Sequence, residues 1–410
     1  MREKFLPFSP PLIGEAEINE VVDTLRSDWI TTGPRVKQFE EEFAQFVHAP
    51  DALAVSSGTA ALHLALLALG IGSGDAVITS PLTFCSAVHV IEHVGAVPIF
   101  CDVEPNTLNI DPQDIRSKIE KAQRDLGLRV KAIMPVHLYG HPCDRDAILK
   151  IAAEYNLAVI EDAAHSLPAL YKGSPIGSLS ATESIPVLTC FSFYATKNLT
   201  TAEGGMLTGH TGLLDRARRW SLHGMSRDAW KRYGANGSWT YDVVCPGYKY
   251  NMTDIQAALG LHQLRKLPKF HARRCEIVLR YNAAFARRGE FQLPAERSEV
   301  QHAWHLYVLR LNLNRTGISR DQFIDAMRSR NIGCSVHFIP VHLLQYYREK
   351  YRFAPEDFPC ALAAFQRMVS LPLSARLTDE DVTDVIAAVT EILDEHQPAR
   401  VARSHDVVSV

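Results

Sequence analysis

Short runs of β-branched and apolar residues alternate with helical stretches along most of this chain. The runs fall at residues 76–79, 97–100, 130–136, 157–160 and 187–193, and the helical patterns at 15–28, 36–47, 59–69, 86–93 and 145–155. This alternation is typical of βαβ units, so it predicts an α/β fold with a mainly parallel sheet. Ligands bind such sheets at the carboxyl ends of the strands, where several of these runs end in polar residues.

The pattern changes after residue 267. A basic helix is predicted over 269–288, a half-buried strand over 304–313, a helix over 319–330, a strand over 332–338 and a last helix capped by Thr378. We expect a large α/β domain over 1–267, a smaller α+β domain over 268–396 and a tail over 397–410. The length of 410 residues agrees with two or three domains.

Composition excludes several classes of protein. The net charge is 43 − 46 = −3, which provides no basic surface for nucleic acid or an anionic membrane. No segment approaches the roughly 20 apolar residues that span a bilayer, and the first residues lack the apolar core of a signal peptide. The eight cysteines form no CxxC pair, so we expect reduced thiols in a cytoplasmic protein.

Three motifs carry candidate chemistry. In the first, a strand leads through Ser56-Ser57-Gly58-Thr59 into an Ala/Leu-rich helix. Amides at a helix N-terminus beside hydroxyl groups form a phosphate cradle, and glycine lets the backbone approach the anion. An ordinary Ser/Thr helix cap is the alternative.

In the second motif, Glu161-Asp162-Ala163-Ala164-His165 follows a buried strand directly. A carboxylate there would stabilise a cation or a protonated heterocycle that is costly to bury alone. The alternative is that Asp162 only caps a helix.

The third motif, residues 190–207, contains Lys197 and Ser192 among aromatic, small and hydroxyl residues. A desolvated lysine has a lowered pKa and becomes a nucleophile toward carbonyl carbon. The alternative is a solvated surface lysine, the usual state of this residue type.

Pyridoxal phosphate (PLP) needs all three motifs. The cradle would hold its phosphate, a carboxylate would keep its pyridine nitrogen protonated, and a lysine would form the Schiff base. Phe84, which follows a strand end, is the candidate for stacking on the ring, unless it is an ordinary core residue.

A metal site is the competing interpretation for His137, His141, Cys143 and Asp144. Gly140 and Pro142 deny this loop helical geometry, so we favour an active-site loop and expect no metal ligands.

From about residue 8 to 393 the chain resembles the DegT/DnrJ/EryC1/StrS family of sugar aminotransferases, which have the aspartate-aminotransferase fold (PLP fold type I). The resemblance is carried, besides the three motifs, by Trp29-Ile30-Thr31-Thr32-Gly33-Pro34, by Pro246-Gly247-Tyr248-Lys249-Tyr250-Asn251-Met252-Thr253-Asp254 and by Leu371-Pro372-Leu373.

The resemblance implies a role for each candidate residue. Lys197 would hold PLP covalently and then move the proton between substrate and cofactor. Asp162 would pair with the pyridine nitrogen, Phe84 would stack on the ring, and His165, which is Gln in many relatives, would lie near the 3′-oxygen. Gly58, Thr59 and Ser192 would bind the phosphate, and Asn251 would reach the phosphate of the neighbouring subunit of a homodimer.

The implied reaction is a ping-pong transamination. L-Glutamate would give its amino group to the cofactor, and a nucleotide-linked keto sugar would then accept it. Residues 222–251 look most like members that aminate C4 of UDP-linked hexoses, with Lys249 and His342 as candidate substrate contacts. Amination at C3, a dTDP or GDP sugar, or a PLP-binding regulator without turnover are the alternatives.

Overall fold

The computed structural model describes residues 2–179, 185–225 and 240–396. Its centre is a seven-stranded sheet in the order β1-β9-β8-β5-β4-β2-β3. The strands are β1 (Asp51–Val55), β2 (Asp75–Thr79), β3 (Val97–Phe100), β4 (Arg129–Met134), β5 (Ala158–Asp162), β8 (Val187–Ser192) and β9 (Gly205–Gly209). Neighbouring strands run parallel except where β9 pairs with β1 and β8. The predicted α/β class with a mixed, mainly parallel sheet is therefore confirmed.

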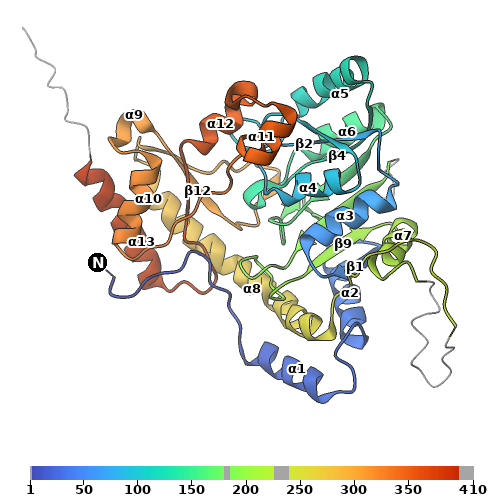
Figure 1. Ribbon diagram of the computed structural model, residues 1–410. Coiled ribbons are helices and arrows are strands. Elements are labelled where there is room, and N and C mark those ends of the chain that lie inside the picture. The colour runs from blue at the N-terminus through green and yellow to red at the C-terminus, as the bar shows by residue number, and fades with distance from the viewer. Residues whose placement is uncertain (1, 180–184, 226–239, 397–410) are drawn as a thin grey trace, which may run out of the picture.

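Helices cover both faces of this sheet (Figure 1). They are α2 (Pro34–Phe46), α3 (Gly58–Ala68), α4 (Ser86–His93), α5 (Pro112–Leu126), α6 (Arg145–Glu154) and α7 (Thr211–Ser221). Helix α3 is apolar all round because it packs against β8 and β9 as well as α4 and α7. The expected strands and helices of this region match to within two residues at each end.

A second layered unit is built from C-terminal residues. An antiparallel sheet of β10 (Phe291–Gln292), β12 (Tyr307–Leu311) and β13 (Met368–Leu371) packs with α10 (Arg320–Ser329) and α13 (Asp379–Glu395). Thr378 caps α13 as predicted, its Oγ1 accepting from the amide of Asp381 at 3.1 Å. Shorter elements are η1 (Leu138–Gly140), β6 (Leu170–Tyr171), β7 (Ser174–Pro175), β11 (Val300–Gln301), α9 (Leu313–Thr316), η3 (Val341–Leu343), α11 (Gln345–Tyr351), η4 (Pro355–Asp357) and α12 (Pro359–Phe365).

The long helix α8 (Asp254–Phe285) connects the two units, and it begins earlier than the predicted basic helix over 269–288. A capping box of Thr253 and Gln256 starts it, and Pro268 lies inside it. Helices α1 (Glu15–Arg26) and α2 pack along its first half, which supports the helix through the proline. The boundary between residues 267 and 268 falls within this helix and stays a prediction.

The predicted strand over residues 332–338 is wrong. This segment makes only isolated bridges, Ile332 with Leu6 and Ser335 with Ser370. Beyond them, the side chains of His337 and Phe338 line a cavity at the large sheet. The segment therefore crosses from the small sheet to the large one instead of continuing the small sheet.

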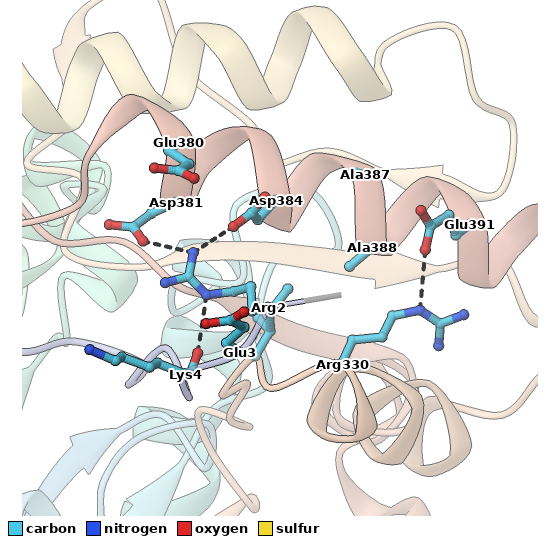
Figure 2. A pocket seen from close by; sticks show the side chains of 11 residues that line it. Arg2, Glu3, Lys4, Arg330, Glu380, Asp381, Asp384, Ala387, Ala388 and Glu391 are labelled. Carbon is cyan, nitrogen blue, oxygen red and sulfur yellow. Dashed lines mark hydrogen bonds and ion pairs between the residues drawn. The ribbon is translucent and has the colours of Figure 1, made fainter.

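The N-terminal segment is attached to the C-terminal unit by ion pairs. Arg2 lies between Asp381 and Asp384 of α13, with N–O distances of 2.8 and 2.7 Å (Figure 2). Arg330 reaches Glu391 of the same helix at 3.5 Å. The two Arg2 contacts hold the N-terminal segment against α13 before the chain crosses to the large sheet (Figure 1), whereas the Arg330 contact joins two parts of the C-terminal unit.

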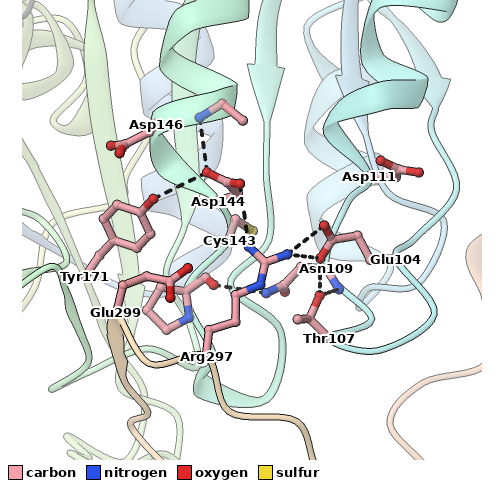
Figure 3. A network of polar contacts seen from close by, with 12 residues as sticks. Glu104, Thr107, Asn109, Asp111, Cys143, Asp144, Asp146, Tyr171, Arg297 and Glu299 are labelled. Atoms are coloured by element: carbon pink, nitrogen blue, oxygen red, sulfur yellow. Dashed lines mark hydrogen bonds and ion pairs between the residues drawn. The ribbon is translucent and has the colours of Figure 1, made fainter.

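A polar network joins the C-terminal unit to the loops of the large sheet. Arg297 donates to both carboxylate oxygens of Glu104 at 2.8 Å and lies 3.6 Å from Asp144 (Figure 3). Asp144 also caps α6 and accepts from Tyr171, and the amide of Cys143 donates to His137. Within the described residues, no group of three or more His, Cys, Asp or Glu side chains is placed to hold a metal ion.

Among the described residues, no helix has both the length and the apolar composition that crossing a membrane requires.

Packing of α8 on α2 predicts a stability difference between two glycine variants. A Cβ at Gly260 would lie 2.7 Å from the ring of the fully buried Phe39, whereas a Cβ at Gly212 in α7 meets nothing within 4 Å. We expect Gly260→Ala to lower the free energy of unfolding by about 1–3 kcal/mol and Gly212→Ala to leave it unchanged or raise it by about 0.5 kcal/mol. Thermal melting of both variants measures this, and equal melting temperatures would contradict the close packing.

Candidate active site

The first wall of the site is the junction between β1 and α3. Ser57 caps α3, its Oγ accepting from the amide of Ala60 at 3.0 Å, so the helix begins at Gly58. Amides in the first turn of a helix have no partner within the helix and carry its positive dipole end. A Cβ on Gly58 would lie 2.8 Å from the Cβ of Ser192, at the end of β8. Gly58 is therefore required by the close approach of this turn to β8.

The second wall is the carboxyl end of β5, where Glu161 and Asp162 lie on opposite faces. Glu161 accepts from Arg145 Nε at 2.6 Å and from Thr189 at 2.7 Å. Burial alone would raise the pKa of Glu161, but Arg145 and His137 hold it well below its usual value. Asp162 lines the cavity, and one of its oxygens accepts from the amide of Ala164 at 3.1 Å.

Lys197 lies opposite Asp162, in the turn that follows β8. Its amide donates to Tyr194 O at 2.9 Å, and its side chain lines the cavity. Burial lowers the pKa of the Lys197 amine to about 8, although Asp162 opposes this shift. Burial raises the pKa of Asp162, and the charge of Lys197 acts against it. The two groups thus form a buried pair of opposite charge.

One cavity of about 470 Å³ brings most of the predicted cofactor residues together. It is lined by Gly58, Thr59, Phe84, Asp162, His165, Ser192 and Lys197, which come from four separate loops. Phe84 is 57% exposed, so it is not an ordinary core residue.

Three other predicted residues lie outside this cavity. Asn251 bridges Val55 of β1 and donates to Thr32 Oγ1 at 2.6 Å. Lys249 is exposed and bridges Leu222. His342 is fully buried, its Nε2 lying 3.1 Å from Pro355 O, so this geometry leaves it no path to a substrate in the cavity. Within the segment 222–251, whose resemblance to C4-aminating members the sequence analysis noted, Trp230, Lys231, Arg232, Tyr233 and Trp239 lie outside the described residues.

Among the cavity residues that sequence reasoning did not assign, His305 makes the most informative contact. It precedes β12 and contacts His165, with ring centroids 4.4 Å apart. His337 also lines the cavity, and its Nδ1 lies 2.8 Å from Ser370 Oγ. Nothing in the spacing of the sequence relates residue 305 to residue 165, because their contact depends on how the C-terminal unit docks.

Comparison with known proteins identifies the family. Residues 11–390 match the DegT/DnrJ/EryC1/StrS aminotransferase family. The chain belongs to this family. It is 51% identical over 394 residues to the spore coat polysaccharide biosynthesis protein SpsC of Bacillus subtilis, covering 96% of this chain and 98% of SpsC.

Solved structures agree with this assignment. The PLP form of Spr1654 from Streptococcus pneumoniae has a TM-score of 0.85 at 35% identity, covering 96% of this chain and all of that one (100%). PseC from Helicobacter pylori, an aminotransferase involved in pseudoaminic acid biosynthesis, has a TM-score of 0.85 at 25% identity. The match covers 96% of this chain and 100% of PseC. The chain is therefore a PLP-dependent sugar aminotransferase of fold type I. The alternative of a PLP-binding regulator without turnover is thereby excluded.

The residues of the cavity fit PLP. The first turn of α3 and Ser192 offer donors and a positive dipole end to a phosphate, and Gly58 leaves the room that a Cβ would fill. Asp162 offers a buried carboxylate that lacks a full counter-charge, and Lys197 offers an amine with a lowered pKa. This set of groups matches a cofactor with an anionic end, a basic ring nitrogen and an aldehyde.

The lowered pKa of Lys197 predicts how PLP attachment depends on pH. Only the unprotonated amine attacks the aldehyde, and its fraction rises tenfold per pH unit below the pKa. We expect the attachment rate in cofactor-free protein to rise up to about pH 8 and then level off. Stopped-flow absorbance measures the rate, and borohydride reduction with peptide mass spectrometry locates the pyridoxyl group.

The matched controls are Lys197→Ala, which should gain no pyridoxyl group in that peptide, and Lys249→Ala, which should behave as wild type. A rate that is still rising steeply above about pH 9 would contradict the lowered pKa.

Proposed function

We propose that this aminotransferase transfers the amino group of L-glutamate to C4 of a nucleotide-linked keto hexose in the cytoplasm, with UDP as the nucleotide. One observation carries the proposal: a single cavity contains the lysine, the carboxylate and the phosphate cradle. Donor and acceptor would therefore use the same site in turn. Eight free thiols fit a reducing compartment.

The proposed chemistry assigns Asp162 to the cofactor's ring nitrogen. Bound PLP supplies an electron sink for the carbanion formed at the reacting carbon. Asp162 would keep a proton on the ring nitrogen, because a buried carboxylate is stabilised by a positive partner. This interaction would orient the ring between Phe84 and the floor of the cavity.

Lys197 would hold the cofactor covalently and then move protons at the substrate carbon. An amine with a pKa near 8 releases and takes up protons readily near neutral pH. The amide of Lys197 donates to Tyr194 O within the turn that follows β8, and this turn would hold the lysine at the same side of the cavity in both half-reactions. His165 would donate to the 3′-oxygen of the cofactor.

The choice of a UDP-linked 4-keto sugar has support from outside the cavity. Tyr248 and Tyr250 stack with centroids 5.0 Å apart and flank the exposed Lys249. Such a group suits a base ring and a diphosphate. The names of SpsC and PseC place those relatives in the biosynthesis of spore coat polysaccharide and of pseudoaminic acid. A 3-keto sugar or a dTDP or GDP sugar is the alternative.

A homodimer with shared active sites is also part of the proposal. Tyr241, Val243 and Val244 expose 50–57% of their surface, and Phe84 and Tyr194 are exposed at the cavity. Large apolar side chains exposed in two such segments are typical of a surface that a partner covers. A second copy of the chain would cover them, and Asn251 would then reach the neighbouring phosphate.

Isotope transfer tests the reaction directly. With 15N-glutamate and a panel of UDP-, dTDP- and GDP-linked keto sugars, we expect a 15N-labelled amino sugar only from a UDP-linked 4-keto hexose, detected by mass spectrometry. Lys197→Ala should fold and bind PLP yet lose at least about 1,000-fold in rate, because it lacks the proton-transferring amine.

Lys249→Ala is the matched lysine control. Because Lys249 would contact the diphosphate, we expect its loss to raise the KM for the sugar. Because it lies outside the cavity, conversion of the cofactor by glutamate should not change. Labelled product from another nucleotide or from a 3-keto sugar would replace the substrate proposed here, and wild-type turnover by Lys197→Ala would overturn the mechanism.

Charge placed on the exposed apolar surface tests the dimer. We expect Val244→Asp to shift the protein toward monomer in analytical ultracentrifugation and to weaken PLP binding, since the site would lose its shared residues. Leu279→Asp is the control, because Leu279 is 69% exposed on α8 and far along the chain from this surface. A wild-type protein that sediments as a monomer at micromolar concentration would contradict the dimer.

A further inference from the structure

His165 and His305 line the cavity together and come from distant parts of the chain. His165 follows β5, and His305 directly precedes β12, with both residues more than nine-tenths buried. A neutral imidazole carries a hydrogen on one nitrogen and a lone pair on the other, and the partner of one nitrogen decides the state of the second.

Asn198 fixes the state of His305. Its Nδ2 donates to Leu167 O at 2.9 Å and to Ala303 O at 2.8 Å, which turns its Oδ1 toward His305 Nδ1 at 3.3 Å. Because a carbonyl oxygen only accepts, His305 Nδ1 must carry the hydrogen. His305 Nε2 then carries no hydrogen and has a free lone pair.

His165 is fixed in the opposite state. The backbone amide of Tyr139 donates to His165 Nδ1 at 3.2 Å. An amide only donates, so Nδ1 has the lone pair and Nε2 carries the hydrogen. The two adjacent rings thus present one donor and one acceptor in the same cavity.

The surroundings keep His305 neutral. Burial lowers its pKa well below the usual value, and His165, Lys197, Arg274 and His337 add to this effect. The guanidinium of Arg274, which is buried, donates to His305 O at 3.2 Å. Burial and these four groups all disfavour the imidazolium, so the ring stays neutral and Nε2 is available as a hydrogen-bond acceptor.

His305 lines the cavity, and a ring nitrogen with a lone pair there can accept a hydrogen bond from a ligand. The two proposed substrates differ in the donors that they offer. The carboxylates of glutamate only accept, and its amine has to lie at the reacting carbon. A hexose carries several neutral hydroxyl groups. We propose that His305 Nε2 accepts a hydrogen bond from a hydroxyl group of the sugar substrate, so that His305 discriminates between the half-reactions; this inference rests on the proposed function.

The tautomers are tested in the holoenzyme by 15N NMR with labelled histidine. We expect the His305 signals to show a protonated Nδ1 and a bare Nε2, and those of His165 the reverse, without change between about pH 6 and about pH 8. Variants His305→Gln and His165→Gln assign the signals. A protonated His305 Nε2 would overturn the proposal whatever the activity.

The kinetic test separates the two half-reactions in single turnovers, followed by the absorbance of the cofactor. His305→Phe keeps a flat ring without an acceptor, whereas His305→Gln can donate to Asn198 and still present an oxygen. We expect His305→Phe to lower kcat/KM for the sugar about 10- to 100-fold while kcat/KM for glutamate changes less than about threefold. His305→Gln should recover most of the loss.

Other outcomes overturn the inference in distinguishable ways. Equal losses of kcat/KM with glutamate and with the sugar would mean that His305 acts through Lys197, which serves both half-reactions, and not through a hydroxyl group of the sugar. An unchanged sugar half-reaction in His305→Phe would show that no hydroxyl group binds there. A wild-type enzyme that reacts with glutamate but with no keto sugar would instead refute the proposed function, while the tautomer measurement would stand by itself.

Discussion

The site depends on a lysine and a carboxylate that are buried in one cavity with opposite charges. Lys197 and Asp162 act on each other, and each moves the pKa of the other back toward its ordinary value. Leaving either charge buried alone would cost several kcal/mol. The pairing of β5 with β8 brings them together, because Asp162 is the last residue of β5 and Lys197 lies in the turn that follows β8. A cofactor with a basic ring nitrogen and an aldehyde suits both partners.

Strand geometry explains why two adjacent carboxylates have different roles. Successive side chains of a strand point to opposite faces, so Glu161 and Asp162 cannot share an environment. Glu161 is neutralised by Arg145 and hydrogen-bonded to Thr189, which makes it a structural ion pair. Asp162 faces the cavity, where the amide of Ala164 and the charges of Lys197 and His137 stabilise its carboxylate, although burial still raises its pKa. Asp162, whose negative charge is less fully compensated than that of Glu161, is the carboxylate available to a ligand.

The cavity is completed by segments from the C-terminal unit. His305 is held by the amide oxygens of Tyr139 and Asn198, and His337 and Phe338 enter from the segment that precedes η3. Arg297 ties the same unit to Glu104 beside the large sheet. Docking of the two units and the chemistry of the site are therefore coupled: a shift of the C-terminal unit would move the donor and acceptor that His165 and His305 present.

The sequence by itself determined the parts of this protein that depend on neighbours along the chain. Local patterns include the alternation of strands and helices, the caps at Ser57 and Thr378, and the lysine motif. They predicted the large sheet, and they selected Gly58, Asp162 and Lys197, which the structure places around one cavity. Tertiary structure decided the rest. Helix α8 continues through Pro268 because α1 and α2 pack on it, residues 332–338 leave the small sheet to reach the cavity, and His342 is buried. His305 meets His165 across 140 positions of sequence (305 − 165) through docking alone, and contacts of that range leave no periodic signal in the chain.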